Sequence, residues 1–334
     1  MIQDQRKNPS TSKRKSIAFF QPGSIRPDND LISSSHVHMF AEDVHLHVMP
    51  LGSHARTKHK FTVELTSPDV EVEKIIRYAF PHNGYVQHSL TESISEFIKQ
   101  CAFELAYKGL TFHEIVRGRQ IEDRRTPSRK LREEPPDPER MFFASHIPGQ
   151  VINIGSHYVQ IIPRVEWAKW RRAFILIPSS DVWRIEIPKQ LGGYKNHPQL
   201  LRALIKSGTP LPKFINDAMA EQKELPTFDF KEFHKQQDLI AANETAVWGW
   251  AGRELWRDQT LEYYQFYRHV CFAKTMNVLR EHILLSINSL LKRISFSSNL
   301  VIKGLPSLAE LDETLSKMAK GEISFDDAWN AIDL

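Results

Sequence analysis

The chain of 334 residues lacks most of the features that assign a protein to a common functional class. It has only two cysteines, Cys101 and Cys271, and neither lies in a CxxC pair or another metal-binding spacing. We expect both to be reduced side chains in helices, as in a cytosolic protein. No apolar run approaches the roughly 20 residues of a membrane-spanning helix. The first residues also contain no apolar segment of a secretory signal, so we expect no membrane contact.

The motifs of common enzymes are also missing. The sequence has no phosphate-binding glycine loop, dinucleotide-binding glycine motif, serine nucleophile elbow or Cys/His nucleophile spacing. The segment HEIVR at 113–117 misses the zinc-protease pattern, because Arg117 stands where the second histidine ligand belongs. Glu71 and Glu73, which follow Pro68 and Asp69, are explained by the start of a helix rather than by a magnesium site. We therefore expect no catalytic residue, no cofactor and no enzymatic activity.

Four histidines form two His-x-His pairs near the N-terminus. His36 and His38 lie in one alternating segment, 36–40, and His45 and His47 lie in a second, 44–48. Alternation of this kind predicts two strands. Residues two apart on a strand share a face, so paired strands could present all four imidazoles to a transition metal. The interpretation that we favour is a half-exposed hairpin without a metal.

The body of the chain has almost no net charge. The net charge is +4, but residues 1–27 hold six basic side chains against one acidic side chain. The remaining 307 residues hold 38 basic and 39 acidic side chains, whereas a duplex-binding domain usually carries a basic face. We expect residues 1–30 to be a disordered basic tail. Lys13, Arg14 and Lys15 are its candidates for contact with nucleic acid.

The pattern of strands and helices predicts an α+β fold, with a mixed strand/helix N-terminal half and a C-terminal half dominated by long helices. We expect an α+β domain over 31–194, with a charged loop at 117–140, and a mainly helical region over 195–334. Besides the two histidine segments, strands are predicted at 60–65, 111–116, 151–154, 158–162, 174–177 and 182–187. Helices are predicted at 68–79, 89–108, 198–206, 212–223, 230–243, 307–318 and 325–332.

A long stretch without glycine or proline is the strongest pattern in the chain. It runs from Arg253 to Lys303, between Gly252 and Gly304. Apolar residues recur in it at the helical period and predict a helix over 256–294, which as one helix would be roughly 60 Å long. Whether 253–303 forms one helix or two stays open. A helix of this length is typical of a strut, a stalk or an oligomer interface. The candidate interface residues are Tyr263, Tyr267, Phe272, Met276, Leu279, Ile283, Ile287 and Leu290.

Aromatic residues cluster just before this helix. Trp248, Trp250 and Trp256 surround Gly249, and tyrosines follow. Aromatics mixed with arginine can stack on nucleic-acid bases. They are also enriched in protein interfaces. We favour packing between subunits or domains over base stacking.

Two blocks of the chain resemble the portal proteins of tailed phages. The first joins a Pro-Asn turn at 80–83, a capped helix with an acidic-Phe pair at 89–98, a glycine at 109 and a strand at 113–116. The second is the segment 177–188, followed by Gly192, Gly193 and Tyr194. The resemblance covers about a third of the chain, and His82 is an insertion relative to the family's turn. It implies a ring-forming, non-enzymatic structural protein through which double-stranded DNA passes.

Three functions are compatible with these patterns. The first is an oligomeric assembly protein of portal type, in the host cytoplasm or in a virion, which contacts itself, other assembly proteins and DNA without sequence specificity. The second is a protein-interaction or regulatory module of a mobile element or defence system. The third is a nucleic-acid-processing protein, which would need a carboxylate cluster that the sequence does not display.

Overall fold

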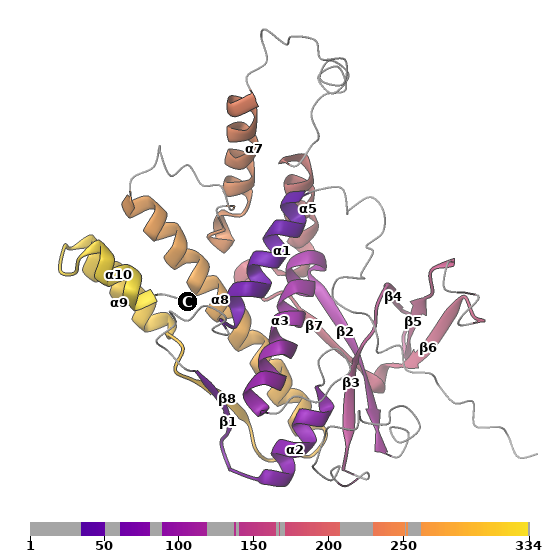
Figure 1. Cartoon of the computed structure of the whole chain (residues 1–334). Helices are drawn as coiled ribbons and strands as arrows, with labels where there is room; N and C mark the ends of the chain where they lie inside the picture. Colours follow the sequence, from indigo (N-terminus) through magenta and orange to yellow (C-terminus); the bar gives the residue numbers. More distant parts are fainter. Residues whose placement is uncertain are drawn as a thin grey trace, which may run out of the picture.

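A computed structural model describes residues 35–50, 61–80, 89–118, 140–164, 171–207, 230–250 and 262–332, together with the single residues 137, 167 and 252. The fold is α+β, and its C-terminal part is rich in helices (Figure 1). The described helices are α1 (Ser35–Val48), α2 (Val70–Ala79), α3 (Leu90–Lys108), α5 (Gly193–Ser207), α7 (Phe230–Glu244), α8 (Glu262–Arg293), α9 (Leu308–Ala319) and α10 (Phe325–Ile332).

The described strands form three separate antiparallel sheets. A two-stranded sheet pairs β1 (Thr62–Leu65) with β8 (Leu300–Lys303). A second sheet has the order β3-β2-β7, with β2 at Leu110–Arg117, β3 at Phe142–His146 and β7 at Val182–Glu186. The third has the order β4-β5-β6, with β4 at Gln150–Asn153, β5 at His157–Ile161 and β6 at Phe174–Pro178. Figure 1 shows this third sheet at the margin of the molecule, away from the helices.

The histidine segments were predicted as two strands, and this prediction is wrong. Both lie in the single helix α1. The apolar side chains that α1 buries are Val37, Phe40, Ala41, Val44 and Val48, which follow the helical spacing. The alternation of histidine with apolar residues coincides with this pattern over short stretches only. The burial of one helical face shows that this segment is a helix and not two strands.

Most other predicted elements are present, with ends shifted by a few residues. Asp69 caps α2 by accepting from the backbone N–H of Glu71 and Val72. Ser89 caps α3, and Gly109 ends α3 in the left-handed conformation (φ +79). Strands β3 and β8 were not predicted as separate elements. The predicted helix at 212–223, most of the charged loop at 117–140 and the tail at 1–30 lie outside the described residues.

Helix α8 is one continuous helix of 32 residues. Residues 262–293 of the long stretch therefore form one helix and not two. Its predicted first residues, 256–261, lie outside the described part of the chain. Figure 1 shows α8 crossing the molecule behind α1 and α3. One hydrophobic core joins side chains of α1, α3, β7 and α8, so the regions on either side of residue 194 share their interior.

The turn Trp248-Gly249-Trp250 connects the N-terminal and C-terminal parts of this core. The Phe40 ring of α1 packs edge-on against Trp248 and Trp250, at 5.0 and 5.3 Å between ring centroids. The indole N–H of Trp250 donates to the Asp43 carboxylate at 2.8 Å. Arg268 of α8 donates to the Trp250 carbonyl oxygen at 2.5 Å. Trp248 and Trp250 therefore pack within the chain, and Trp256 lies outside the described residues.

Glycine is required at the centre of this turn. Gly249 has φ +69, and a Cβ there would lie 2.5 Å from the Cys271 carbonyl carbon and against the backbone nitrogen of Phe272. Both neighbours are backbone atoms of α8, so they cannot rotate away. Gly321 offers a matched comparison because it has φ +71 and a Cβ added to it would meet no atom within 4 Å.

We expect Gly249→Ala to lower the free energy of unfolding by at least about 3 kcal/mol, since it combines a strained φ with overlap against α8. Gly321→Ala is expected to cost about 1–2 kcal/mol, the strained φ alone. Urea titrations of the two variants and the wild type measure the difference. Equal losses in the two variants would contradict the close approach of the turn to α8.

Candidate functional site

No group of three or more His, Cys, Asp or Glu side chains in the described part of the chain is arranged to hold a metal ion. His36 and His38 point in directions roughly 200° apart around α1, so the strand geometry that the metal site required is absent. His38 instead pairs with Glu42 at 2.8 Å. His45 donates to the Lys99 carbonyl at 3.1 Å, and His47 donates to the Asp43 carbonyl at 2.7 Å.

A buried cluster of titratable side chains lies between α3 and the β3-β2-β7 sheet. The Glu104 carboxylate pairs with Lys108 at 2.8 Å, and its Oε1 lies 4.0 Å from His146 Nε2. The His113 and His146 rings lie 5.6 Å apart, and Cys101 Sγ lies 4.0 Å from His113 Nε2. Glu104, Cys101 and His113 are each at most 2% exposed. These three side chains are therefore shielded from solvent in this structure.

Burial sets the protonation of these histidines. Burial lowers the pKa of His113 well below its usual range, and the facing His146 adds to the effect. The pKa of His146 is lowered too, mainly by burial. His197, whose ring lies against Gly109, has its pKa lowered by burial to about 4. All three are therefore neutral in the folded protein at neutral pH.

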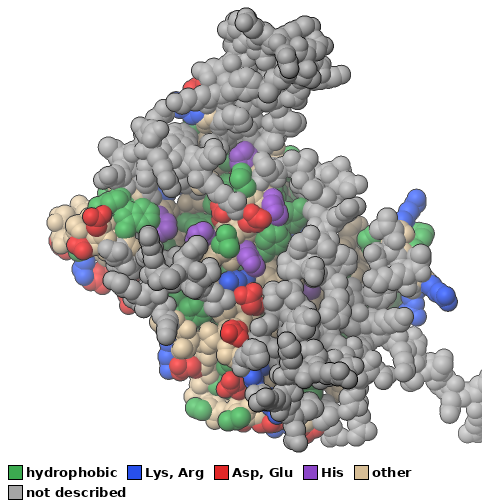
Figure 2. Space-filling view, in the orientation of Figure 1, with side chains coloured by type: hydrophobic (Ala, Val, Ile, Leu, Met, Phe, Trp, Pro, Cys, Tyr) green, Lys and Arg blue, Asp and Glu red, His purple; other side chains and the backbone are tan. Residues whose placement is uncertain are grey.

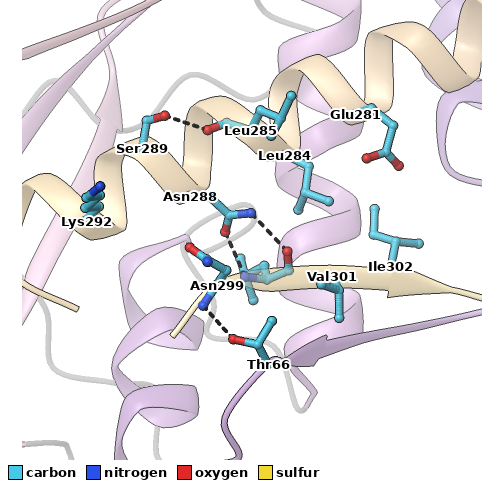
Figure 3. Close-up of a pocket in the computed structure, with 11 residues that line it drawn as sticks. Thr66, Glu281, Leu284, Leu285, Asn288, Ser289, Lys292, Asn299, Val301 and Ile302 are labelled. Atoms are coloured by element: carbon cyan, nitrogen blue, oxygen red, sulfur yellow. Dashed lines mark hydrogen bonds between the residues drawn. The ribbon is translucent and has the colours of Figure 1, made fainter. Parts of the chain in front are cut away.

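A groove with a volume of about 580 Å³ lies between α8 and β8 (Figure 3). The side chain of Asn288 bridges its two walls: Nδ2 donates to the Leu300 carbonyl at 3.0 Å, and Oδ1 accepts from the Leu300 N–H at 2.7 Å. Glu281 and Lys292 lie at opposite ends of the helical wall in Figure 3, several turns apart. The groove thus offers amides and apolar side chains but no pair of groups arranged for acid–base catalysis.

Six of the eight predicted interface residues are core residues. Phe272 is 8% exposed, and the other five are at most 2% exposed. They pack in the core that α8 shares with α1 and α3, so elements of the same chain cover them, and their role in an interface stays a prediction. The predicted helical period is confirmed, but the elements that cover the apolar face belong to the same chain. The five besides Phe272 are Met276, Leu279, Ile283, Ile287 and Leu290.

The other two predicted interface residues lie on the surface. Tyr263 and Tyr267 are 46% and 41% exposed, and Tyr264 beside them is 48% exposed. Residues three and four apart share a helix face, so the three tyrosines form one patch at the start of α8, called here the tyrosine surface. The role of Tyr263 and Tyr267 in an interface stays a prediction. Lys13, Arg14 and Lys15 lie outside the described residues.

A second apolar surface was missed from the sequence. Ile152, Ile161, Phe174 and Leu176 of the β4-β5-β6 sheet are 37–57% exposed. Ile154, at the end of β4, is also more than half exposed. The sequence does contain evidence for this surface. Consecutive residues of these segments are apolar, so both faces of each strand are apolar, which indicates a strand covered on both faces.

Acid is expected to destabilise the fold through the buried histidines. Their pKa values are lower in the folded than in the unfolded chain, so the stability that they contribute is present above about pH 6.5 and is lost as the pH falls toward the folded values. His197 alone should account for about 2 kcal/mol between about pH 7 and about pH 5. Urea titrations across this range measure the slope. The variant His197→Gln should reduce the slope, whereas His157→Gln, at an exposed histidine, should keep it; an unchanged slope in His197→Gln would contradict the assignment.

Comparisons with known proteins find similarity among solved structures but not in sequence. No family model matches the chain, and no curated protein matches it in sequence. Among solved structures, the chain is similar to a chain in the virion of a native gene transfer agent particle, with a TM-score of 0.40 and 11% sequence identity. That similarity covers 91% of this chain and 89% of the other. At this level of similarity, the match does not establish a family or a function.

Proposed function

We propose that this chain is a non-enzymatic assembly protein that joins copies of itself head to tail into a closed ring of portal type, through which double-stranded DNA passes. The observation that carries the proposal is the presence of two unlike exposed apolar surfaces on one chain. One is the open face of the β4-β5-β6 sheet, and the other is the tyrosine surface of α8. Figure 1 shows the sheet and the start of α8 at opposite sides of the molecule.

Two different surfaces on opposite sides are what a head-to-tail contact requires. Each copy then uses one surface toward each neighbour, and the assembly closes into a ring when the rotation per copy allows it. Apolar surfaces of this kind mark sites of protein interaction rather than free surface. The resemblance of 80–116 and 177–194 to phage portal proteins also supports the proposal. The partners proposed are further copies, other assembly proteins and DNA contacted without sequence specificity, in a virion or the host cytoplasm.

The basic tail fits this role. Lys13, Arg14 and Lys15 supply charge for phosphate contacts, while the rest of the chain is almost neutral. A near-neutral body suits a wall along which DNA slides, because each phosphate contact adds to the affinity that resists movement. No catalytic role is proposed for any residue.

The native mass of the untagged protein tests the proposal. We expect sedimentation at low and at physiological salt to show a closed oligomer of many subunits, and negative-stain images of that species to show rings. A monomer or dimer under both conditions, purified together with an unrelated protein, would contradict the proposal and favour the interaction-module alternative.

A further inference from the structure

We infer that the open face of the β4-β5-β6 sheet of one copy packs on the tyrosine surface, beside α9 and α10, of the next copy. This inference rests on the proposed function and names the contact that builds the ring. The two surfaces belong to opposite sides of the chain, so the contact forms between copies.

The strand register places one continuous apolar face on the sheet. Ile152 pairs with Val159, which pairs in turn with Leu176, and Ile161 pairs with Phe174. Partners in a register share a face, and residues two apart along a strand share it as well. Phe174 is 57% exposed and Leu176 is 46% exposed. All five side chains therefore stand on one side of the sheet, and that side is open.

The opposite face of the same sheet is covered by the chain itself. Ile177 is fully buried there, in a cluster with Phe112 and Val182, and Tyr158 and Ile175 pack against this cluster. The sheet is thus apolar on both sides but covered on one. A strand with this pattern is normally buried on both faces, so a partner for the open face is expected.

The helix segment that carries the tyrosine surface is held in place by packing against α9 and α10. Directly beside the exposed tyrosines, Phe266 and Val270 of α8 are fully buried against α9 and α10. The Phe266 ring packs edge-on against Trp329 at 5.5 Å, and Lys274 forms an ion pair with Asp312 of α9. Tyrosine side chains on a fixed helix supply contact area at low entropic cost, which is why they are enriched in interfaces.

The two ends of the chain carry opposite charge. Residues 150–178, which contain the sheet, hold four basic residues and one acidic residue, a net charge of +3. Residues 307–332, which contain α9 and α10, hold six acidic and two basic residues, a net charge of −4. Figure 2 shows Lys and Arg side chains around the sheet and acidic side chains at the opposite margin. Head-to-tail packing brings these charges together, whereas packing of sheet on sheet would oppose +3 with +3.

The first experiment removes each surface separately and measures assembly by sedimentation and negative-stain imaging. The double variants Phe174→Thr/Leu176→Thr and Tyr263→Gln/Tyr264→Gln should each remain folded and lose the ring. Leu285→Gln is the matched control, since Leu285 is an exposed α8 residue (64%) in the groove beside β8, and it should keep the ring. Loss of assembly in the sheet variant but not in the tyrosine variant would overturn the head-to-tail pairing.

The second experiment exchanges the charges, so that a folding defect cannot imitate the result. Arg164→Glu/Arg171→Glu should weaken association on the order of tenfold. Adding Glu322→Lys/Asp326→Lys to the same chain should restore it, because every contact in a head-to-tail ring pairs the two changed ends. Failure of the combined variant to recover would overturn the inference.

The outcomes separate the two proposals. A wild-type ring that persists in both surface variants overturns the named contact and leaves the portal-type assembly standing. A wild-type chain that forms no ring overturns the proposed function and the contact together.

Discussion

The rest of the structure depends on the close approach of the Trp248-Gly249-Trp250 turn to the backbone of α8. Because Gly249 has no side chain, the turn lies against Cys271 and Phe272, and Trp250 reaches Asp43 of α1 while its carbonyl accepts from Arg268. A buried ion or amide without such partners would cost several kcal/mol, so the network is specific as well as stabilising. This turn ties the first described helix to the longest one and makes a single core from residues that lie about 200 positions apart in sequence.

Local patterns predicted most of the elements, because caps, turns and periodicity are local properties. Ser89, Gly109 and Asp69 act at the helix ends where the sequence places them. The failure at α1 has a physical reason. Alternation over five residues is a weaker constraint than the helical spacing of Val37 to Val48, which becomes decisive only when α3 and α8 are present to cover that face. Strand β8 was missed because its partner β1 is more than 200 residues away.

The candidate site was harder to predict than the fold. An apolar stripe such as Met276, Leu279 and Ile283 indicates that one face of the helix is covered, but it does not indicate whether the same chain or another chain covers it. Here the covering elements are α1 and α3 of the same chain. The exposed residues of the proposed contact, such as Phe174 and Leu176, can be identified only when the strand register shows which face of the sheet the chain itself covers. The sequence feature that predicts this surface is the presence of apolar residues on both faces of the strands of the β4-β5-β6 sheet.

Closure of a ring depends on the angle that one chain fixes between its two contact surfaces. The tyrosine surface is continuous with α8, and α8 is anchored along its length in the main core. The β4-β5-β6 sheet is joined to the body through a separate small cluster of Phe112, Ile147, Ile177 and Val182. Half-buried side chains, among them Tyr158 and Ile175 of the sheet, pack against this cluster. In the proposed ring, the packing of this cluster therefore sets the angle between the two contact surfaces.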